Sequence, residues 1–189
     1  MEISMNTGDP EVRHSTASQG HPKPAHPPAG AATLWRDALR TGLVGGAVAS
    51  LASTLALAWC GRRETGSGAA PTNATSQWLW GRKALAARRP SWRHTALGYA
   101  IHHGTATFWA VLHAGLHARR PPAASPGAAI ARAAATAATA FAIDYTITPR
   151  RLRPGFEHHL SPRAMAIVYA TFALGLACGC AAAERGRRR

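Results

Sequence analysis

Six side chains able to bind protons or metal ions lie in the second half of the chain, close to apolar stretches of sequence. They are His102, His103, Asp144, Glu157, His158 and His159. Imidazole titrates near neutral pH, and imidazole nitrogen with carboxylate oxygen is the donor set of many metal sites. This combination predicts a polar cluster that relays protons, binds a cation or holds a metal.

Asp144 and His102 are the two members of this cluster that fall inside apolar stretches at comparable depth. At ~1.5 Å per residue, His102 lies ~10 Å and Asp144 ~6 Å from the same end of their predicted helices. An Asp in lipid costs roughly 2.5 to 3.5 kcal/mol at a helix centre, so a partner is expected. A functional site and a pair that only fixes helix packing both remain open. Residues 157–159 have no companion motif and read equally well as a solvated loop.

Haem and enzyme chemistry find less support. His102 and His113 are eleven residues apart and share a helix face, but bis-imidazole haem ligation needs a facing histidine. The three other apolar stretches contain no histidine. Cys60, Cys178 and Cys180 have the spacing of small packing residues rather than of ligands or a disulfide framework. No catalytic triad or phosphate loop is present, so we expect neither a cofactor nor an enzyme activity.

Four apolar stretches must position these side chains. They cover residues 41–60, 95–116, 128–147 and 162–183. About 20 residues of helix cross a ~30 Å hydrocarbon core, and the first stretch contains no charged residue. The second holds three histidines, and the third holds Arg132 and Asp144 near its ends. The sequence thus predicts an all-α integral membrane bundle of four transmembrane helices.

The segments around these spans have distinct compositions. Residues 1–33 are polar and rich in Pro, His and Ser, which predicts a disordered tail. Residues 34–40 have helical spacing and are expected at the membrane surface, leading into a membrane domain over 34–183. Residues 73–87 predict a short interfacial amphipathic helix, with Trp78, Trp80 and Trp92 as interfacial anchors. Residues 184–189 form a basic C-terminal tail.

Positive charge dominates the chain, with 22 basic against 8 acidic residues and a net charge of +14. The basic residues gather at the ends of the apolar stretches, at 36 and 40, 62 and 63, 82–93, 119 and 120, 150–153, and 185–189. That placement indicates contact with the bilayer and its anionic lipid headgroups rather than with nucleic acid.

Glycines at four-residue spacing predict close helix packing. Gly42 and Gly46 lie in the first span, and Gly175 and Gly179 form a GxxxG pattern in the fourth. Such faces also suit a homo-oligomer or a membrane protein partner. Four spans place both termini on one side, and the basic residues divide equally between the two sides. We expect the termini in the cytoplasm, because the basic tail would otherwise be translocated.

Several short stretches resemble a family of small four-helix inner-membrane proteins of proteobacteria whose function is unknown. The matching residues are 70–74, 78–81, 94–95, 98–99, 101–103, 108–110, 144–145, 154–157 and 160–161. The resemblance implies a multi-pass protein of the cytoplasmic membrane and no particular activity; the symporter labels of some relatives are not transferred. We expect a structural or accessory role. The alternative is a cation or proton pathway through His102, His103 and Asp144, and metal or haem binding is the third and least favoured hypothesis.

Overall fold

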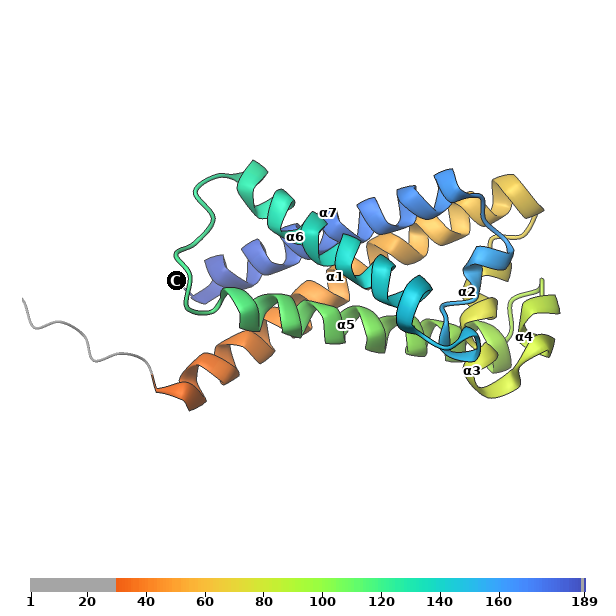
Figure 1. The fold of residues 1–189 in the computed structure, drawn as a ribbon, viewed down its shortest axis with the longest axis horizontal. Coiled ribbons are helices and arrows are strands. Elements are labelled where there is room, and N and C mark those ends of the chain that lie inside the picture. The colour runs from red at the N-terminus through yellow and green to blue at the C-terminus, as the bar shows by residue number, and fades with distance from the viewer. Residues whose placement is uncertain (1–29, 188) are drawn as a thin grey trace, which may run out of the picture.

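Helix α1, Ala31–Thr65, is the element against which the long helices α5 and α7 pack. The computed structural model describes residues 30–187 and residue 189, and in this part of the chain all regular structure is helical. Helices α5 (Leu97–His117) and α7 (Pro162–Arg187) lie along two sides of α1, and α6 (Pro126–Ala142) packs mainly on α7 (Figure 1). The all-helical architecture expected from the sequence is therefore present.

The contact between α1 and α5 depends on glycines that bring the two backbones together. A Cβ on Gly42 would come within 2.5 Å of the Cα of Val111, and one on Gly46 within 2.5 Å of the Cα of Thr107. Real Cβ atoms do not approach backbone this closely, so no larger residue fits without moving a helix. The two helices are antiparallel, because a later residue of α1 contacts an earlier residue of α5.

The contact between α1 and α7 uses the neighbouring face of α1 in the same way. A Cβ on Gly175 would lie 2.7 Å from the Cα of Ala49, and one on Gly179 would lie 2.8 Å from the Cα of Gly45. Small residues on both helices thus allow α7 to lie against α1, as the spacing of the glycines predicts for a helix pair.

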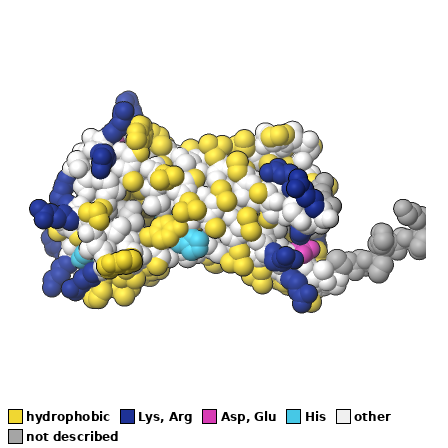
Figure 2. Space-filling model, turned by 180° about the vertical axis from the view of Figure 1, so that it is seen from behind, with side chains coloured by type: hydrophobic (Ala, Val, Ile, Leu, Met, Phe, Trp, Pro, Cys, Tyr) yellow, Lys and Arg dark blue, Asp and Glu magenta, His cyan; other side chains and the backbone are white. Residues whose placement is uncertain are grey.

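Three helical segments are long and apolar enough to cross a membrane: Ala31–Thr65, Pro126–Ile147 and Pro162–Arg187. Helix α5 has a suitable length of 21 residues, but its four histidines lower its hydropathy and it does not belong to this group. Three of the four expected spans therefore meet both criteria. Lys and Arg side chains gather at the two ends of the bundle, with mainly apolar and uncharged surface between them (Figure 2).

The connection between α1 and α5 differs from the single interfacial helix expected over residues 73–87. It forms three short helices, α2 (Ala70–Thr75), α3 (Gln77–Trp80) and α4 (Arg82–Ala86), and Gly81 with φ +56° separates the last two. All six residues of α2 are buried. Burial is possible because polar groups are bonded internally: Asn73 Nδ2 donates to the carbonyls of Ala87 and Arg89 at 3.0 Å each.

The loop between α6 and α7 completes this end of the molecule, through the turns Arg150–Leu152 and Phe156–His158. Gly155, with φ +89°, lies against the carbonyl of Ala74. Gln77 Nε2 and Trp78 Nε1 both donate to the carbonyl of Arg153, at 2.8 and 3.3 Å. We call residues 66–91 and 148–161 the cap. The opposite end, which holds Ala31 and Arg187, is the terminal end (Figure 1).

The expected interfacial tryptophans have unequal environments. Trp78 and Trp80 are half-buried, and Trp80 Nε1 donates to the carbonyl of Arg93 at 3.0 Å. Trp92 is 90% exposed and belongs to a π-helical turn, Trp92–Ala96, that precedes α5. Two of the three anchors therefore also hold the cap together.

Several expected boundaries shift in the structure. Most of the predicted disordered tail, residues 1–29, lies outside the described residues, but residues 31–33 belong to α1. The surface helix expected at 34–40 is continuous with α1, since no Pro or Gly separates it from the span. The predicted basic tail is helical as far as Arg187, which is the last residue of α7.

Candidate functional site

Two cavities lie along the line where α5 faces α6, which we call the seam. Helix α6 packs mainly on α7 and touches α5 at few points. The cap cavity lies beneath the cap, and the terminal cavity opens at the other end of the bundle. The seam is therefore the place where polar side chains reach space inside the bundle.

The cap cavity is small and mostly apolar, with a volume of ≈ 60 Å³. Trp78, Trp109, Phe156 and Phe172 form much of its wall. Its polar groups come from five different elements, and they are Ser53, Thr75, His102, Thr105, Asp144 and Tyr169. Since a water molecule needs about 10–15 Å³ of such space and two or more polar partners, the cavity has room for a few waters.

His102 is held by a hydroxyl of α1 in a way that fixes its protons. Ser53 Oγ lies 2.8 Å from the carbonyl of Ala49, which can only accept, so the hydroxyl proton goes there. His102 Nε2, 2.8 Å from the same Oγ, must then be the donor. The neutral ring consequently carries its lone pair on Nδ1, the atom at which a further proton adds.

Asp144 enters the cavity from a π-helical turn, Ile143–Ile147, that extends α6. Tyr169 on α7 donates to its Oδ2 at 2.6 Å, and no described residue donates to Oδ1. The pairing of Asp144 with His102 expected from their depths is wrong, because each binds a hydroxyl on its own side of the cavity. The hydroxyl of Thr75 on the cavity wall is buried and has no hydrogen-bond partner.

Polar groups continue from this cavity toward the surface of the cap. Tyr145, next in the chain to Asp144, donates to Glu157 Oε2 at 3.4 Å. Glu157 is 21% exposed, and its Oε1 lies 4.0 Å from His158 Nε2. A carboxylate and a phenol thus lie near the half-buried Asp144 on the cap side.

The remaining members of the expected cluster lie elsewhere. His103 faces α1, where its Nδ1 is 2.7 Å from Ser50 Oγ, and its ring lies 5.8 Å from the ring of Tyr99. His159 is half-buried in the cap. Burial lowers its pKa from the usual imidazole value, and the carbonyl of Leu85 partly opposes that shift. The six side chains therefore form a two-residue site, an extension at residues 157 and 158, and two separate histidines.

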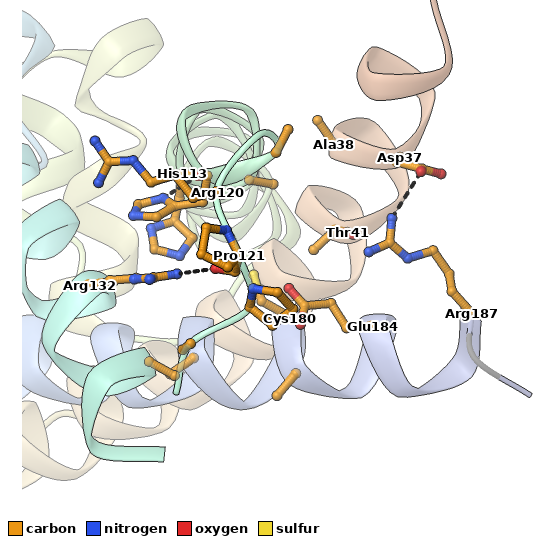
Figure 3. A pocket seen from close by; sticks show the side chains of 18 of the residues that line it. Asp37, Ala38, Thr41, His113, Arg120, Pro121, Arg132, Cys180, Glu184 and Arg187 are labelled. Carbon is orange, nitrogen blue, oxygen red and sulfur yellow. Dashed lines mark hydrogen bonds and ion pairs between the residues drawn. The ribbon is translucent and has the colours of Figure 1, made fainter. Parts of the chain in front are cut away.

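The terminal cavity is larger, at ≈ 380 Å³, and the ends of all four long helices surround it (Figure 3). His113 is 7% exposed at the seam, and its Nδ1 lies 2.8 Å from Thr136 Oγ1. Thr136 donates to the carbonyl of Arg132 at 3.3 Å, so His113 is the donor and keeps its lone pair on Nε2. His117 donates from Nδ1 to the carbonyl of His113 at 2.9 Å, which leaves its Nε2 free as well.

Charged residues stand at the rim of the terminal cavity. Arg187 pairs with Asp37 at 3.2 Å, and Arg132 donates to the carbonyl of Pro121 at 3.2 Å, on different sides of the opening (Figure 3). Glu184 also lines the space. Sequence reasoning did not predict this site, although the i, i+4 spacing of His113 and His117 places both on one face of α5.

Alanine separates the two cavities. The core between them is made of Ala49, Ala106, Ala110, Ala133, Ala137 and Ala173, with Phe172, Leu176 and Trp109 beside them. His102 and His113 are eleven residues apart on α5, or ~16 Å. These apolar residues form a septum between the two cavities in this structure, and the buried hydroxyl of Thr107 lies on the side of α5 that faces α1.

Among the residues that the structure describes, no three His, Cys, Asp or Glu side chains come together in a way that could hold a metal ion. Cys60, Cys178 and Cys180 are free thiols. His113 and His117 belong to the same helix, with ring centroids 4.6 Å apart, and do not face each other across a haem-sized gap. The chain matches no protein-family model, and no curated protein and no solved structure is detectably similar to it.

Proposed function

We propose that the chain crosses the cytoplasmic membrane four times, with both termini in the cytoplasm, and that the seam is a pathway for protons. Contacts from Gly42 to Ser53 of α1 hold α5 alongside it, from Val111 to His102. If α1 crosses the membrane, α5 crosses at the same depth. The polar side chains of α5 point toward α1, α6 and the cavities, which supports insertion despite its low hydropathy.

One observation carries the proton pathway: the two ends of a single seam each hold a histidine that lines a cavity and whose second ring nitrogen is left as a proton acceptor. His102 lies in the cap cavity and His113 in the terminal cavity, on the same face of α5. Ionisable residues within a membrane are costly, and where they line cavities they mark ion or proton paths. A proton suits the cap cavity better than a metal cation, because the cavity offers one imidazole, one carboxylate already bound to Tyr169 and a few hydroxyls around very little space.

A proton from the cap side passes Glu157 and Tyr145, reaches Asp144, and transfers through water in the cap cavity to His102 Nδ1. From the terminal end, the corresponding acceptors are His117 and His113. The septum must open for transfer between the two histidines, because ~16 Å exceeds any direct hydrogen bond. Helix α6 is the element that can move, since the described contact that holds it to α5 by polar groups is His113 to Thr136.

The experiment uses full-length protein in liposomes that contain a pH-sensitive dye, with a potassium diffusion potential as the driving force. The wild type is expected to acidify the lumen faster than empty liposomes. Asp144→Asn and His102→Gln are each expected to reduce this rate at least ten-fold. His103→Gln is the matched control, because His103 is the next residue on α5 but faces Ser50, away from the seam.

Absence of flux in the wild type would sink the pathway, and so would equal flux in Asp144→Asn and His103→Gln. Circular dichroism and gel filtration in detergent must show that each variant is folded. An intact bundle without flux would leave the structural or accessory role as the better account of the protein.

A further inference from the structure

A third cavity, outside the seam, lies between the cap and the ends of α1 and α5, with a volume of ≈ 640 Å³. We call it the cap groove. Arg62, Arg88 and Arg89 line it, and no acidic side chain does. Among the described residues, neither Arg62 nor Arg89 forms an ion pair. The cap groove therefore holds uncompensated positive charge.

The backbone around these arginines is held by side-chain hydrogen bonds. Ser67 Oγ donates to the carbonyl of Arg88 at 2.5 Å, and Asn73 Nδ2 donates to the carbonyl of Arg89 at 3.0 Å. The Arg88 guanidinium donates to the carbonyl of Thr65 at the end of α1. That contact offsets the negative end of the α1 dipole, which is worth about half a charge and would otherwise oppose an anion. The arginines are thus presented on a rigid frame.

The cap groove continues from its charged part toward the middle of the bundle. Its wall there consists of Thr54 and Ala58 on α1 and Tyr99 on α5. Arg62 and Thr54 are eight residues apart, or ~12 Å along the helix. Small side chains on α1 leave this part open, and the hydroxyl of Thr54 is buried without a hydrogen-bond partner. The charged end of the groove suits an anion, and the end near Thr54 suits an apolar acyl chain.

The position of the cap groove fits the membrane interface. Trp92 is 90% exposed, and Trp59 is 51% exposed with the Arg63 guanidinium 4.6 Å from its ring centroid. Tryptophan at this density is typical of the headgroup region. The charged part of the groove is then level with lipid phosphates, and the part lined by Thr54 is level with acyl chains.

We propose that the cap groove binds an anionic phospholipid, with the phosphate between Arg62, Arg88 and Arg89 and an acyl chain along Ala58 and Tyr99. Guanidinium groups bind phosphate oxygens through paired hydrogen bonds. A zwitterionic headgroup is disfavoured, because its ammonium meets three arginines and no carboxylate. The proposal rests on the membrane insertion proposed above and is independent of proton flux.

The test measures binding to the full chain purified in a neutral detergent, by native mass spectrometry and by thermal shift. The probes are phosphatidylglycerol, phosphatidylcholine and inorganic phosphate. We expect saturable binding of phosphatidylglycerol, at least ten-fold weaker binding of phosphatidylcholine, and no shift from inorganic phosphate at the same concentrations. The double variant Arg62→Gln/Arg89→Gln is expected to bind phosphatidylglycerol at least ten-fold more weakly.

The matched control is Arg82→Gln/Lys83→Gln, which removes the same charge from exposed positions of the cap outside the groove. This variant should bind as the wild type does. Ala58→Leu, which narrows the acyl part without changing charge, should also weaken lipid binding. Equal loss in the two charge variants, equal binding of the two lipids, or saturation by inorganic phosphate without lipid preference would overturn the proposal. A chain that stays in the membrane but fails these tests refutes the cap groove alone.

Discussion

The α1–α7 interface and the α5–α6 seam are built from similar small residues but pack very differently. Across the first, Gly175 and Gly179 meet Ala49 and Gly45 with the backbones in contact. Helix α6 has a glycine only at its second position, Gly127, and its buried residues, Ala133, Ala137 and Ala140, are all alanine. A methyl group at each turn, together with the Trp109 ring, keeps α5 and α6 apart and leaves the two cavities between them.

This difference assigns stability and chemistry to separate parts of the molecule. Van der Waals contact between backbones is the main source of helix association in lipid, where the hydrophobic effect between helices is absent. In the seam the helix backbones are not in contact, and the side chains of His102, Asp144 and His113 lie there instead. We expect substitutions at the α1–α7 interface to change folding and those in the seam to change transport with smaller effects on folding.

The largest expected effect on stability is that of Gly175→Ala. The added methyl would lie 2.7 Å from the Cα of Ala49, so α7 must move away from α1, at a cost of about 1–3 kcal/mol. Gly104→Ala is the matched control, because a Cβ there meets nothing within 4 Å. It should be neutral or stabilising by up to ~1 kcal/mol. Unfolding in detergent, followed by circular dichroism, measures both, and equal effects would refute the proposed division.

A smaller effect is expected in the seam from Thr136→Val. This variant keeps the shape of the side chain but removes the hydrogen bond to His113, which lowers stability by about 1 kcal/mol. Because His113 loses its partner, the proton flux in liposomes should change clearly, while the unfolding free energy changes only by this small amount. A destabilisation larger than that of Gly175→Ala would contradict the comparison.

The smallest effect, and one that disappears at acid pH, is expected from Glu64→Gln. Glu64, beyond the uncharged part of α1, accepts hydrogen bonds from Ser161 Oγ at 2.7 Å and Ser161 N at 2.6 Å, which lower its pKa. A lowered pKa stabilises the fold above the usual carboxyl value of 4.5, and this contribution disappears as the pH falls through the folded pKa. The variant should therefore be less stable than the wild type at neutral pH, and the difference between their melting temperatures should shrink as the pH falls below 4.5.

The long helices and the close glycines follow from local sequence, since charge-free apolar runs and four-residue spacing act within one element. The cap does not follow from it. Asn73 and Gln77 look like the polar face of an amphipathic helix until their partners at Arg89 and Arg153 are known. The sequence likewise indicates no role for Ser53, Thr75 and Tyr169, because a hydroxyl becomes part of a site only through the element that packs against it. The pairing of Asp144 with His102 failed for that reason.

Two of the hydrogen bonds that join the halves of the cap have a consequence for the order in which the protein assembles. Gln77 and Trp78 share the carbonyl of Arg153, a residue 76 and 75 positions later in the chain. At about 5–20 residues per second, the ribosome needs roughly 4–15 s to synthesise that interval. In the four-span insertion proposed above, α5 and α6 enter the bilayer during this time, while the first half of the cap still lacks its partner. A chaperone or insertase that shields this half would act on a timed intermediate rather than on the finished bundle.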